Sequence, residues 1–301
     1  MNAELLPAGR PASMEPLTCL HDLGDCLIGH RPLSDLQRDR LERVGLSQVE
    51  ELAEGLFIRG DAWLCEEDLL ALPGREGPWV LQDAEGNRLA WSGPRNYPAS
   101  GLPIVQAHPE SFPLRHPWDL LRLHEQALAS LQTPRIAGYV HPGAWIMGLL
   151  RLDTGSILLP GVCIEGPVVI GEDCKIGPNC YIRGPVSIGD RCHIGQAVEL
   201  KNAIIMNDTN VGHLSYCGDS ILGEHVNFGA GTICANFRHD GHSHRSMVDG
   251  VLVDTGLRKL GVICGDNVHT GINTSLYPGR KLWPNQSTRP GEIVQRDLKP
   301  D

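Results

Sequence analysis

Residues 152–201 read LDTGSI LLPGVC IEGPVV IGEDCK IGPNCY IRGPVS IGDRCH IGQAVE LK, so that every sixth residue is a leucine or an isoleucine. A small or β-branched residue stands four positions after most of them, as at Val162, Cys174 and Val186. A period of six matches neither a 3.6-residue helix nor the two-residue alternation of a strand. It is typical of the hexapeptide repeat of a parallel β-helix, in which three hexads form one triangular coil. Residues eighteen apart should therefore stack about 4.8 Å apart, the spacing of paired strands.

The six-residue register continues beyond Leu200 with two kinds of irregularity. The hexads that begin at Leu200 and Cys217 are one residue short, and the period disappears between residues 235 and 260. It resumes at Cys264 and runs to Leu282. We therefore expect residues 235–260 to leave the coil as a loop, and the β-helix domain as a whole to occupy residues 133–297.

Composition narrows the class of protein. The 301 residues include 35 glycines and 22 prolines, which suits a turn-rich solenoid because the apolar fraction, 41%, is ordinary. A net charge of −10 argues against a nucleic-acid partner and against an anionic membrane surface. Ten cysteines without a secretory segment favour a cytoplasmic protein, with Cys174, Cys180 and Cys192 as small core residues. No segment is apolar enough over a sufficient length to indicate a membrane span.

Residues 1–112 lack the six-residue period and predict a small α/β domain with a helix near residues 36–52. Residues 6–18, LPAGRPASMEPLT, resemble the opening loop of sugar-1-phosphate nucleotidyltransferases, whose backbone N–H groups wrap the nucleotide phosphates. Pro11 and Ser13 replace a glycine and an arginine of that motif, and a proline removes an N–H donor.

Arg59-Gly60-Asp61 resembles the metal-binding aspartate of the same family, which follows a strand. The family domain is about twice as long as the space before residue 113. The resemblance therefore implies a shortened, inactive nucleotidyltransferase-like domain over residues 1–112, with a need for Mg²⁺ only if that domain were active.

Residues 116–131 predict an amphipathic helix. Pro117 suits the first turn, and one face carries Leu120, Leu121, Leu128 and Leu131. The segment resembles the linker helix that joins the two domains in the same superfamily. We place the linker at residues 113–132.

Arg183 and Lys201 are eighteen residues apart within an unbroken register, so they should stack on neighbouring coils of one wall. Two cations about 5 Å apart repel each other, which favours a site where an anion bridges them. Two solvated surface charges are the alternative.

Three further blocks extend this observation: ELKN at 199–202, GHLSYCGD at 212–219 and VNFGAGTICAN at 226–236. Together they resemble the acetyltransferase half of the bifunctional N-acetylglucosamine-1-phosphate uridyltransferase/glucosamine-1-phosphate acetyltransferase family, and still more its archaeal-type relatives. The resemblance covers roughly residues 113–297. It implies that the β-helix is left-handed and that the chain forms a homotrimer with sites between subunits.

That resemblance implies a role for each matched residue. His213 matches the general base that takes a proton from the sugar amine, a task that suits a histidine because it can be neutral near pH 7. Arg183 and Lys201 match the cations that hold the sugar 1-phosphate. The other substrate positions, which supply neutral hydrogen bonds, are Tyr216, Asn227 and, near the reacting amine, Asn236.

Acetyl-CoA is the co-substrate that the resemblance implies, bound along the groove between adjacent β-helices. Ala230 and Gly231 would permit its close approach. The cations that could hold its phosphates, unless they are ordinary solvated charges, are Arg258, Lys259, Arg280 and Lys281.

The expected loop contains His239, His242 and His244, which raises the question of a metal site. No Cys or carboxylate set of fixed spacing accompanies them, so we expect a polar loop that covers substrate, and no metal.

The sequence thus predicts an acetyl-CoA-dependent N-acetyltransferase that acts on an amino-sugar 1-phosphate, with glucosamine 1-phosphate as first choice, in nucleotide-sugar biosynthesis. No cysteine stands beside His213 in a nucleophile motif, which favours direct transfer over an acyl-enzyme. The alternatives are a non-catalytic regulator or scaffold that binds sugar nucleotides, and a residual sugar-1-phosphate nucleotidyltransferase.

Overall fold

The computed structural model describes residues 1–96 and 101–300. The chain forms two compact units. The first, here called the N-terminal unit, contains Met1–Pro11, Asp22–Asp25 and Pro32–Arg115. The second, the solenoid unit, contains Ala12–His21, Cys26–Arg31 and His116–Asp301. Among the described residues, no helix has the length and apolar character needed to cross a bilayer.

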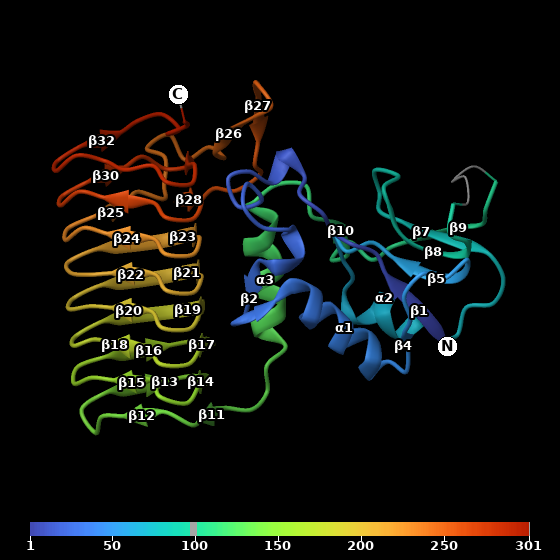
Figure 1. Ribbon diagram of the computed structural model, residues 1–301, viewed down its shortest axis with the longest axis horizontal. Coiled ribbons are helices and arrows are strands. Elements are labelled where there is room, and N and C mark those ends of the chain that lie inside the picture. The colour runs from blue at the N-terminus through green and yellow to red at the C-terminus, as the bar shows by residue number, and fades with distance from the viewer. Residues whose placement is uncertain (97–100, 301) are drawn as a thin grey trace. The chain divides into compact units, whose positions relative to one another are not determined.

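The predicted β-helix is confirmed as a parallel β-solenoid whose strands stack coil upon coil (Figure 1). Strand pairing divides each coil among three walls, which we call A, B and C. Wall A consists of β12 (Tyr139–Val140), β15 (Ile157–Leu158), β18 (Lys175–Ile176), β20 (His193–Ile194), β22 (Asn210–Val211), β24 (Asn227–Phe228) and β29 (His269–Thr270).

Walls B and C share three long strands that turn a corner, β19 (Tyr181–Ile188), β21 (Glu199–Ile205) and β23 (Tyr216–Leu222). The first halves of these strands lie in wall B and the second halves in wall C. Wall B also holds β13 (Trp145–Met147), β16 (Cys163–Glu165), β25 (Ile233–Cys234), β30 (Ser275–Leu276) and β32 (Ile293–Val294). Wall C also holds β11 (Arg135–Ile136), β14 (Leu150–Leu152), β17 (Val168–Ile170), β28 (Val262–Cys264) and β31 (Arg280–Leu282).

The register follows the sequence period. Arg183 pairs with Lys201, eighteen residues on, whereas Leu200 pairs with Cys217, seventeen residues on, because the intervening hexad is short. The aliphatic residues at every sixth position are buried and form one continuous core. Cys174, Cys180 and Cys192 are buried in it, as predicted, and burial raises the pKa of Cys180 to about 11. These thiols therefore act as small core groups.

Tight contact between neighbouring coils explains why residue 195 is a glycine. A Cβ at Gly195 would overlap the carbonyl oxygen of Gly212 on the next coil, whereas a Cβ at Gly212 would find its nearest atom at 3.5 Å. Coil spacing therefore requires glycine at residue 195 and tolerates a methyl group at residue 212.

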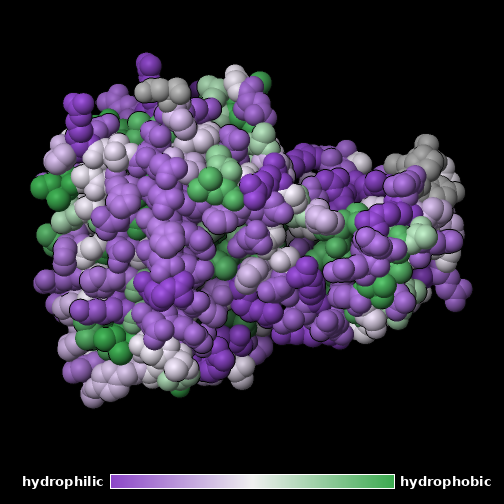
Figure 2. Space-filling view, viewed as in Figure 1, coloured by the Kyte–Doolittle hydropathy of each residue, from purple (hydrophilic) through white to green (hydrophobic). Residues whose placement is uncertain are grey.

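Wall C is covered by the predicted linker helix, which is observed as α3 (Asp119–Ala129). α3 contacts β19, β21 and β23, and the outward-facing residues of this wall, Ile204, Ile221 and Ile263, are buried. α3 also packs against β2 (Leu27–Ile28), from one of the two short N-terminal segments of this unit. The outward-facing residues of wall A are mostly polar, whereas wall B also exposes Trp145, Met147, Ile233 and Ile293. The face of the solenoid unit seen in Figure 2 is largely hydrophilic.

The N-terminal segments are fastened to the solenoid by side-chain contacts. The Nε2 atom of His21 lies 3.0 Å from the carboxylate of Asp266, and that of His30 lies 3.0 Å from the carboxylate of Asp190. Trp283 donates its indole N–H to Glu15 at 3.2 Å. The segment that resembles a nucleotide-binding loop is therefore divided, since residues from Ala12 onward belong to the solenoid unit.

The loop predicted at 235–260 is confirmed, and it contains a feature that the period does not predict. β26 (Arg245–Val248) and β27 (Val251–Asp254) form an antiparallel hairpin, and Phe237 forms a β-bridge with Lys259 where the loop leaves and rejoins the coil.

The N-terminal unit is built on a six-stranded sheet of order β4-β1-β5-β8-β7-β9. The helix predicted near 36–52 is α1 (Leu33–Arg43), which begins and ends earlier. Its strands are β1 (Asn2–Leu5), β4 (Ser47–Gln48), β5 (Glu54–Ile58), β7 (Trp79–Gln82), β8 (Arg88–Pro94) and β9 (Ile104–Gln106). The smaller elements of the chain are α2 (Glu66–Ala71), the pair β6 (Ala62–Trp63) and β10 (Phe112–Pro113), β3 (Arg31–Pro32), and the short 3-10 helices η1 (Ala12–Met14) and η2 (Leu23–Asp25).

Candidate functional site

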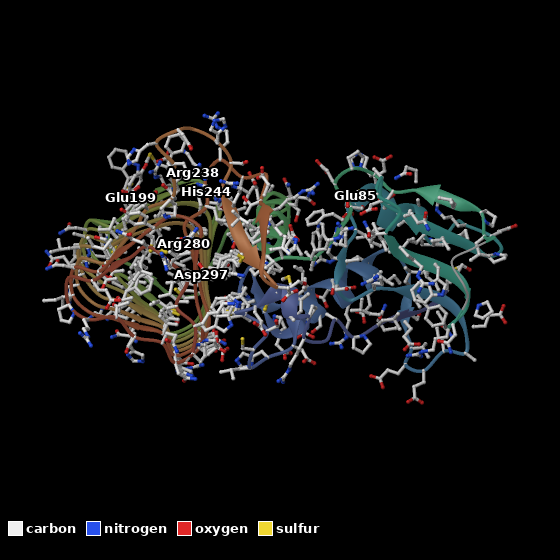
Figure 3. The ribbon with its side chains drawn as sticks, turned by 90° about the horizontal axis from the view of Figure 1, so that it is seen from above. Glu85, Glu199, Arg238, His244, Arg280 and Asp297 are labelled. Carbon is white, nitrogen blue, oxygen red and sulfur yellow. The ribbon has the colours of Figure 1, made fainter. Side chains whose placement is uncertain are left out.

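Wall B carries a column of polar side chains on neighbouring coils. The pairing Glu165–Arg183–Lys201 places one row along this wall, and Tyr181–Glu199–Tyr216 forms a second row beside it. The predicted stacking of Arg183 and Lys201 is confirmed. In the view of Figure 3, down onto the coils, Glu199 and His244 lie on the same side of the solenoid.

Each cation faces a carboxylate of its own. Arg183 donates through Nε and Nη2 to Glu199 Oε1 at 3.1 and 2.6 Å. Lys201 donates through Nζ to both carboxylate oxygens of Asp219, each at 3.1 Å. The expected repulsion between two bare cations is therefore compensated within the chain, because Glu199 and Asp219 supply the opposite charges.

Asp219 also joins two amide side chains to this cluster. Asn202 donates through Nδ2 to Asp219 Oδ1 at 3.0 Å, and Asn236 donates through Nδ2 to Oδ2 at 2.5 Å. The same Nδ2 of Asn236 donates to the Tyr216 hydroxyl oxygen at 2.9 Å. Burial, and then the charges of Asp219 and Glu199, raise the pKa of Tyr216, so its phenol stays protonated at neutral pH.

His244 supports the cluster from the loop. It is 2% exposed, and its Nε2 atom lies 3.1 Å from the backbone carbonyl oxygen of Asn236. Burial lowers the pKa of His244, which favours the neutral ring. Among the described residues, no group of three or more His, Cys, Asp or Glu side chains that could hold a metal ion occurs.

His213 and Asn227 lie apart from this column. His213 is exposed at the corner between walls A and B, where its backbone carbonyl accepts from Ser215 Oγ at 2.8 Å and from the Gly231 N–H at 2.9 Å. Asn227 is exposed on β24 of wall A. Burial, followed by the charges of Lys175 and His213, lowers the pKa of the nearby His193. Of the predicted substrate residues, one chain gathers Arg183, Lys201, Tyr216 and Asn236 in a single hydrogen-bonded cluster.

The predicted coenzyme residues fall into two groups. Ala230 is half-buried, and Gly231 has φ +74° with a Cβ position only 2.5 Å from Asn273 Oδ1, so coil stacking already requires glycine there. Arg258 and Lys259 are exposed where the loop returns to the coil.

The other two cations predicted for the coenzyme phosphates are Arg280 and Lys281. Arg280 is partly buried and donates through Nε to the Pro278 carbonyl at 3.3 Å. The prediction for Lys281 is wrong, because its side chain is 2% exposed and donates to the Met247 carbonyl at 2.6 Å.

The N-terminal unit has a separate pocket of about 260 Å³ at the ends of β1 and β5. Arg59 donates to the carboxylate of Asp61, through Nε at 2.7 Å and through Nη2. The residue that resembles a metal-binding aspartate is thus paired with a guanidinium, an arrangement that does not suit a Mg²⁺ ligand. The pocket is lined by Leu6, Pro7, Arg59, Asp61, Arg88 and Trp91.

Sequence reasoning left Glu199, Asp219 and His244 without a role. The eighteen-residue repeat could have predicted two of these contacts. Glu199 follows Arg183 by 16 residues and Asp219 follows Lys201 by 18, so each pair is separated by about one coil. His244 had no such signal, since it reaches the cluster from outside the repeat.

The coil architecture and its inward hexad rows define a hexapeptide-repeat β-solenoid protein. Two family models match it, "GMPPB C-terminal domain" over residues 164–287 and "Bacterial transferase hexapeptide (six repeats)" over residues 139–184. Through this region the chain is similar to bifunctional sugar-1-phosphate nucleotidylyltransferase/acetyltransferase (GlmU-like) proteins.

Two relatives illustrate the similarity. The bifunctional sugar-1-phosphate nucleotidylyltransferase/acetyltransferase of Sulfurisphaera tokodaii is 38% identical over 182 residues, 60% of this chain and 45% of that protein. The bifunctional protein GlmU of Methanocaldococcus jannaschii is 38% identical over 183 residues, 61% of this chain and 44% of that protein. The chain therefore spans less than half the length of these relatives.

Among solved structures, the acetyltransferase domain of PglB from Neisseria gonorrhoeae is 14% identical, with a TM-score of 0.26 over 66% of this chain and 74% of that one. A score that low carries no argument about function.

Proposed function

We propose that the solenoid unit is an acetyl-CoA-dependent N-acetyltransferase for an amino-sugar 1-phosphate, with glucosamine 1-phosphate as first choice, in nucleotide-sugar biosynthesis. The observation that carries the proposal is the wall B cluster of Arg183, Lys201, Tyr216 and Asn236, which offers two cations and two neutral polar groups within one hydrogen-bonded network. A phosphate ester and sugar hydroxyls require such donors and acceptors. The names of the related proteins support an acetyl group as the one transferred.

The proposed reaction is direct acetyl transfer. The amine nitrogen of the sugar attacks the thioester carbonyl carbon, His213 takes the proton that the nitrogen releases, and the carbon–sulfur bond breaks. The electron pair of that bond leaves with the coenzyme sulfur, which takes up a proton to become a thiol. Proton removal by a positioned histidine is worth about 10²–10⁴-fold in rate. Tyr216, held as a neutral phenol, and Asn227 would contact sugar hydroxyls.

A homotrimer follows from the same proposal. Wall C is covered by α3, which leaves walls A and B to meet other copies of the chain. His213 and Asn227 lie outside the wall B cluster of their own chain, so a site completed between copies would use both sets of residues. Coenzyme contacts are proposed for Ala230, Gly231, Arg258 and Lys259. We further propose that the N-terminal unit is inactive as a nucleotidyltransferase; turnover of a nucleoside triphosphate with a sugar phosphate and Mg²⁺ would contradict this.

The decisive experiment measures release of free CoA thiol from acetyl-CoA with glucosamine 1-phosphate, beside galactosamine 1-phosphate. We expect His213→Ala to lower kcat by about 10²–10⁴-fold while leaving the oligomeric state unchanged. His225→Ala is the matched control, because His225 is also an exposed histidine at a corner of the coil. Full activity of His213→Ala would refute the role of His213. If no amino-sugar phosphate releases CoA from the native protein, the transferase proposal fails and a sugar-nucleotide-binding scaffold becomes the better explanation.

A further inference from the structure

The carboxylate of Asp219 is the centre of the hydrogen-bonded cluster on wall B. Only 5% of its side-chain surface is exposed, and it accepts hydrogen bonds from Lys201, Asn202 and Asn236. All three partners are donors. An ionised carboxylate is the side chain that accepts from all of them without offering a competing N–H.

The backbone conformation and close packing fix the position of Asp219. It lies at the corner between walls B and C with φ +51°, a conformation that aspartate tolerates better than most residues. Its carbonyl oxygen accepts the N–H of Gly261 at 2.8 Å. A Cβ at the preceding Gly218 would overlap the Tyr216 hydroxyl, and a Cβ at Gly261 would overlap the Gly218 carbonyl. Close packing on both sides therefore fixes the direction of the carboxylate.

This fixed carboxylate sets the orientation of Asn236. The Nδ2 atom donates one N–H to Asp219 and the other to Tyr216, which uses both of its donors. The Oδ1 atom of the same amide is consequently turned away from the carboxylate and can accept from an amine or hydroxyl of a ligand. His244 holds the backbone of Asn236 at its carbonyl.

The same carboxylate sets the position of the Lys201 ammonium. Both of its oxygens accept from Nζ, and only 20% of the lysine side chain is exposed. A lysine without such a partner would populate several rotamers, whereas the Lys201 side chain is held toward Asp219 at the corner between walls B and C.

We propose that Asp219 is a positioning residue for acetyl transfer: it orients the Asn236 amide toward the reacting amine and restrains Lys201 where the sugar phosphate binds. This inference rests on the proposed function. It assigns to Asp219 no contact with substrate, and it predicts that Asp219 affects kcat through Asn236 more than it affects binding of the phosphate.

The test compares Asp219→Asn with the native protein in the CoA-release assay. An amide at residue 219 has nearly the same shape but turns an N–H group toward donors, so Asn236 should lose its orientation. We expect kcat to fall about 10²-fold, the usual cost of a small misplacement of a reacting group. The KM for the sugar 1-phosphate should change less than kcat does, because Lys201 loses its restraint and its counter-charge together. The matched control is Asp208→Asn, since Asp208 is also a corner aspartate with positive φ and is paired with Arg191 outside the cluster.

A double-mutant cycle separates positioning from mere stability. In a protein that already carries Asn236→Ala, the further change Asp219→Asn should lower kcat by less than about 3-fold, because the group it orients is gone. The inference is overturned if Asp219→Asn keeps native kcat, if its effect is independent of Asn236, or if Asp208→Asn loses as much activity.

The structural part of the inference can be tested without turnover. Crystal structures of the native protein and Asp219→Asn should differ in the orientation of the Asn236 amide and in the position of Lys201 Nζ. If the native protein acetylates no amino sugar, the proposed function fails while this comparison still decides whether Asp219 positions the two side chains. Identical positions in both structures would overturn the inference.

Discussion

His124 offers a sharp test of how α3 is held against wall C. It lies within α3, has no exposed surface, and neither ring nitrogen has a hydrogen-bond partner among the residues that the structure describes. Burial lowers the pKa of His124 to about 3. The folded protein therefore holds a neutral imidazole whose two nitrogens have lost water without compensation.

The change His124→Leu removes both nitrogens and nearly preserves volume. In the unfolded chain the histidine has a pKa near 6.5, so the unfolded state binds a proton below this pH. The folded state binds that proton only at about pH 3. Stability from this source is thus present above pH 6.5 and declines as the pH falls. From pH 7.5 to 5.0 the loss amounts to about 2 kcal/mol, at 1.36 kcal/mol per pH unit over roughly 1.5 units.

The assay is the free energy of unfolding in urea at pH 7.5 and pH 5.0. We expect His124→Leu to be about 1 kcal/mol or more above the native protein at pH 7.5, because two unsatisfied polar atoms are removed. This advantage should grow by about 2 kcal/mol at pH 5.0. His239→Gln is the control for removal of a histidine, since His239 is exposed in the loop. An advantage of His124→Leu that stays constant between the two pH values would refute the reasoning.

Two further changes test the solenoid unit. Gly195→Ala should lower the unfolding free energy by about 3 kcal/mol because its methyl group meets the Gly212 carbonyl, whereas Gly212→Ala should be nearly neutral; equal losses in urea unfolding would contradict the coil-spacing argument. Lys281→Met removes the donor to the Met247 carbonyl, so trypsin should cleave the β26–β27 hairpin after Arg245 several-fold faster, with the exposed Lys175→Met as control. Unchanged cleavage would show that Lys281 does not anchor the hairpin.

The coil and its inner surface could be predicted from the sequence because their causes are local. Each hexad supplies one buried aliphatic residue, and a shift of one residue would turn that residue outward. The nine-member row from Leu152 to Leu200 therefore determines the register, and with it the neighbourhood of Arg183 and Lys201. The loss of the period after Ala235 located the excursion for the same reason.

What surrounds the coil depends on segments far apart in the sequence. Ile204 and Ile221 face outward and require a cover, which α3 provides by packing against β21 and β23. Lys281 looks like a surface cation in the sequence, but the hairpin formed by distant residues buries it. His244 likewise reaches the backbone of Asn236 only because the loop folds back on the coil.

The candidate site shows the same division. Residue type and spacing named Arg183, Lys201, Tyr216 and Asn236, because stacked coils bring residues one turn apart together. The tertiary structure decided that Glu199 and Asp219 neutralise the two cations and that Asp219 ties Lys201 to Asn236. Hydrophobic burial repeats with the six-residue period, so it can be predicted from one sequence. Hydrogen bonds and charge pairs depend on side-chain directions, which only the folded coils define.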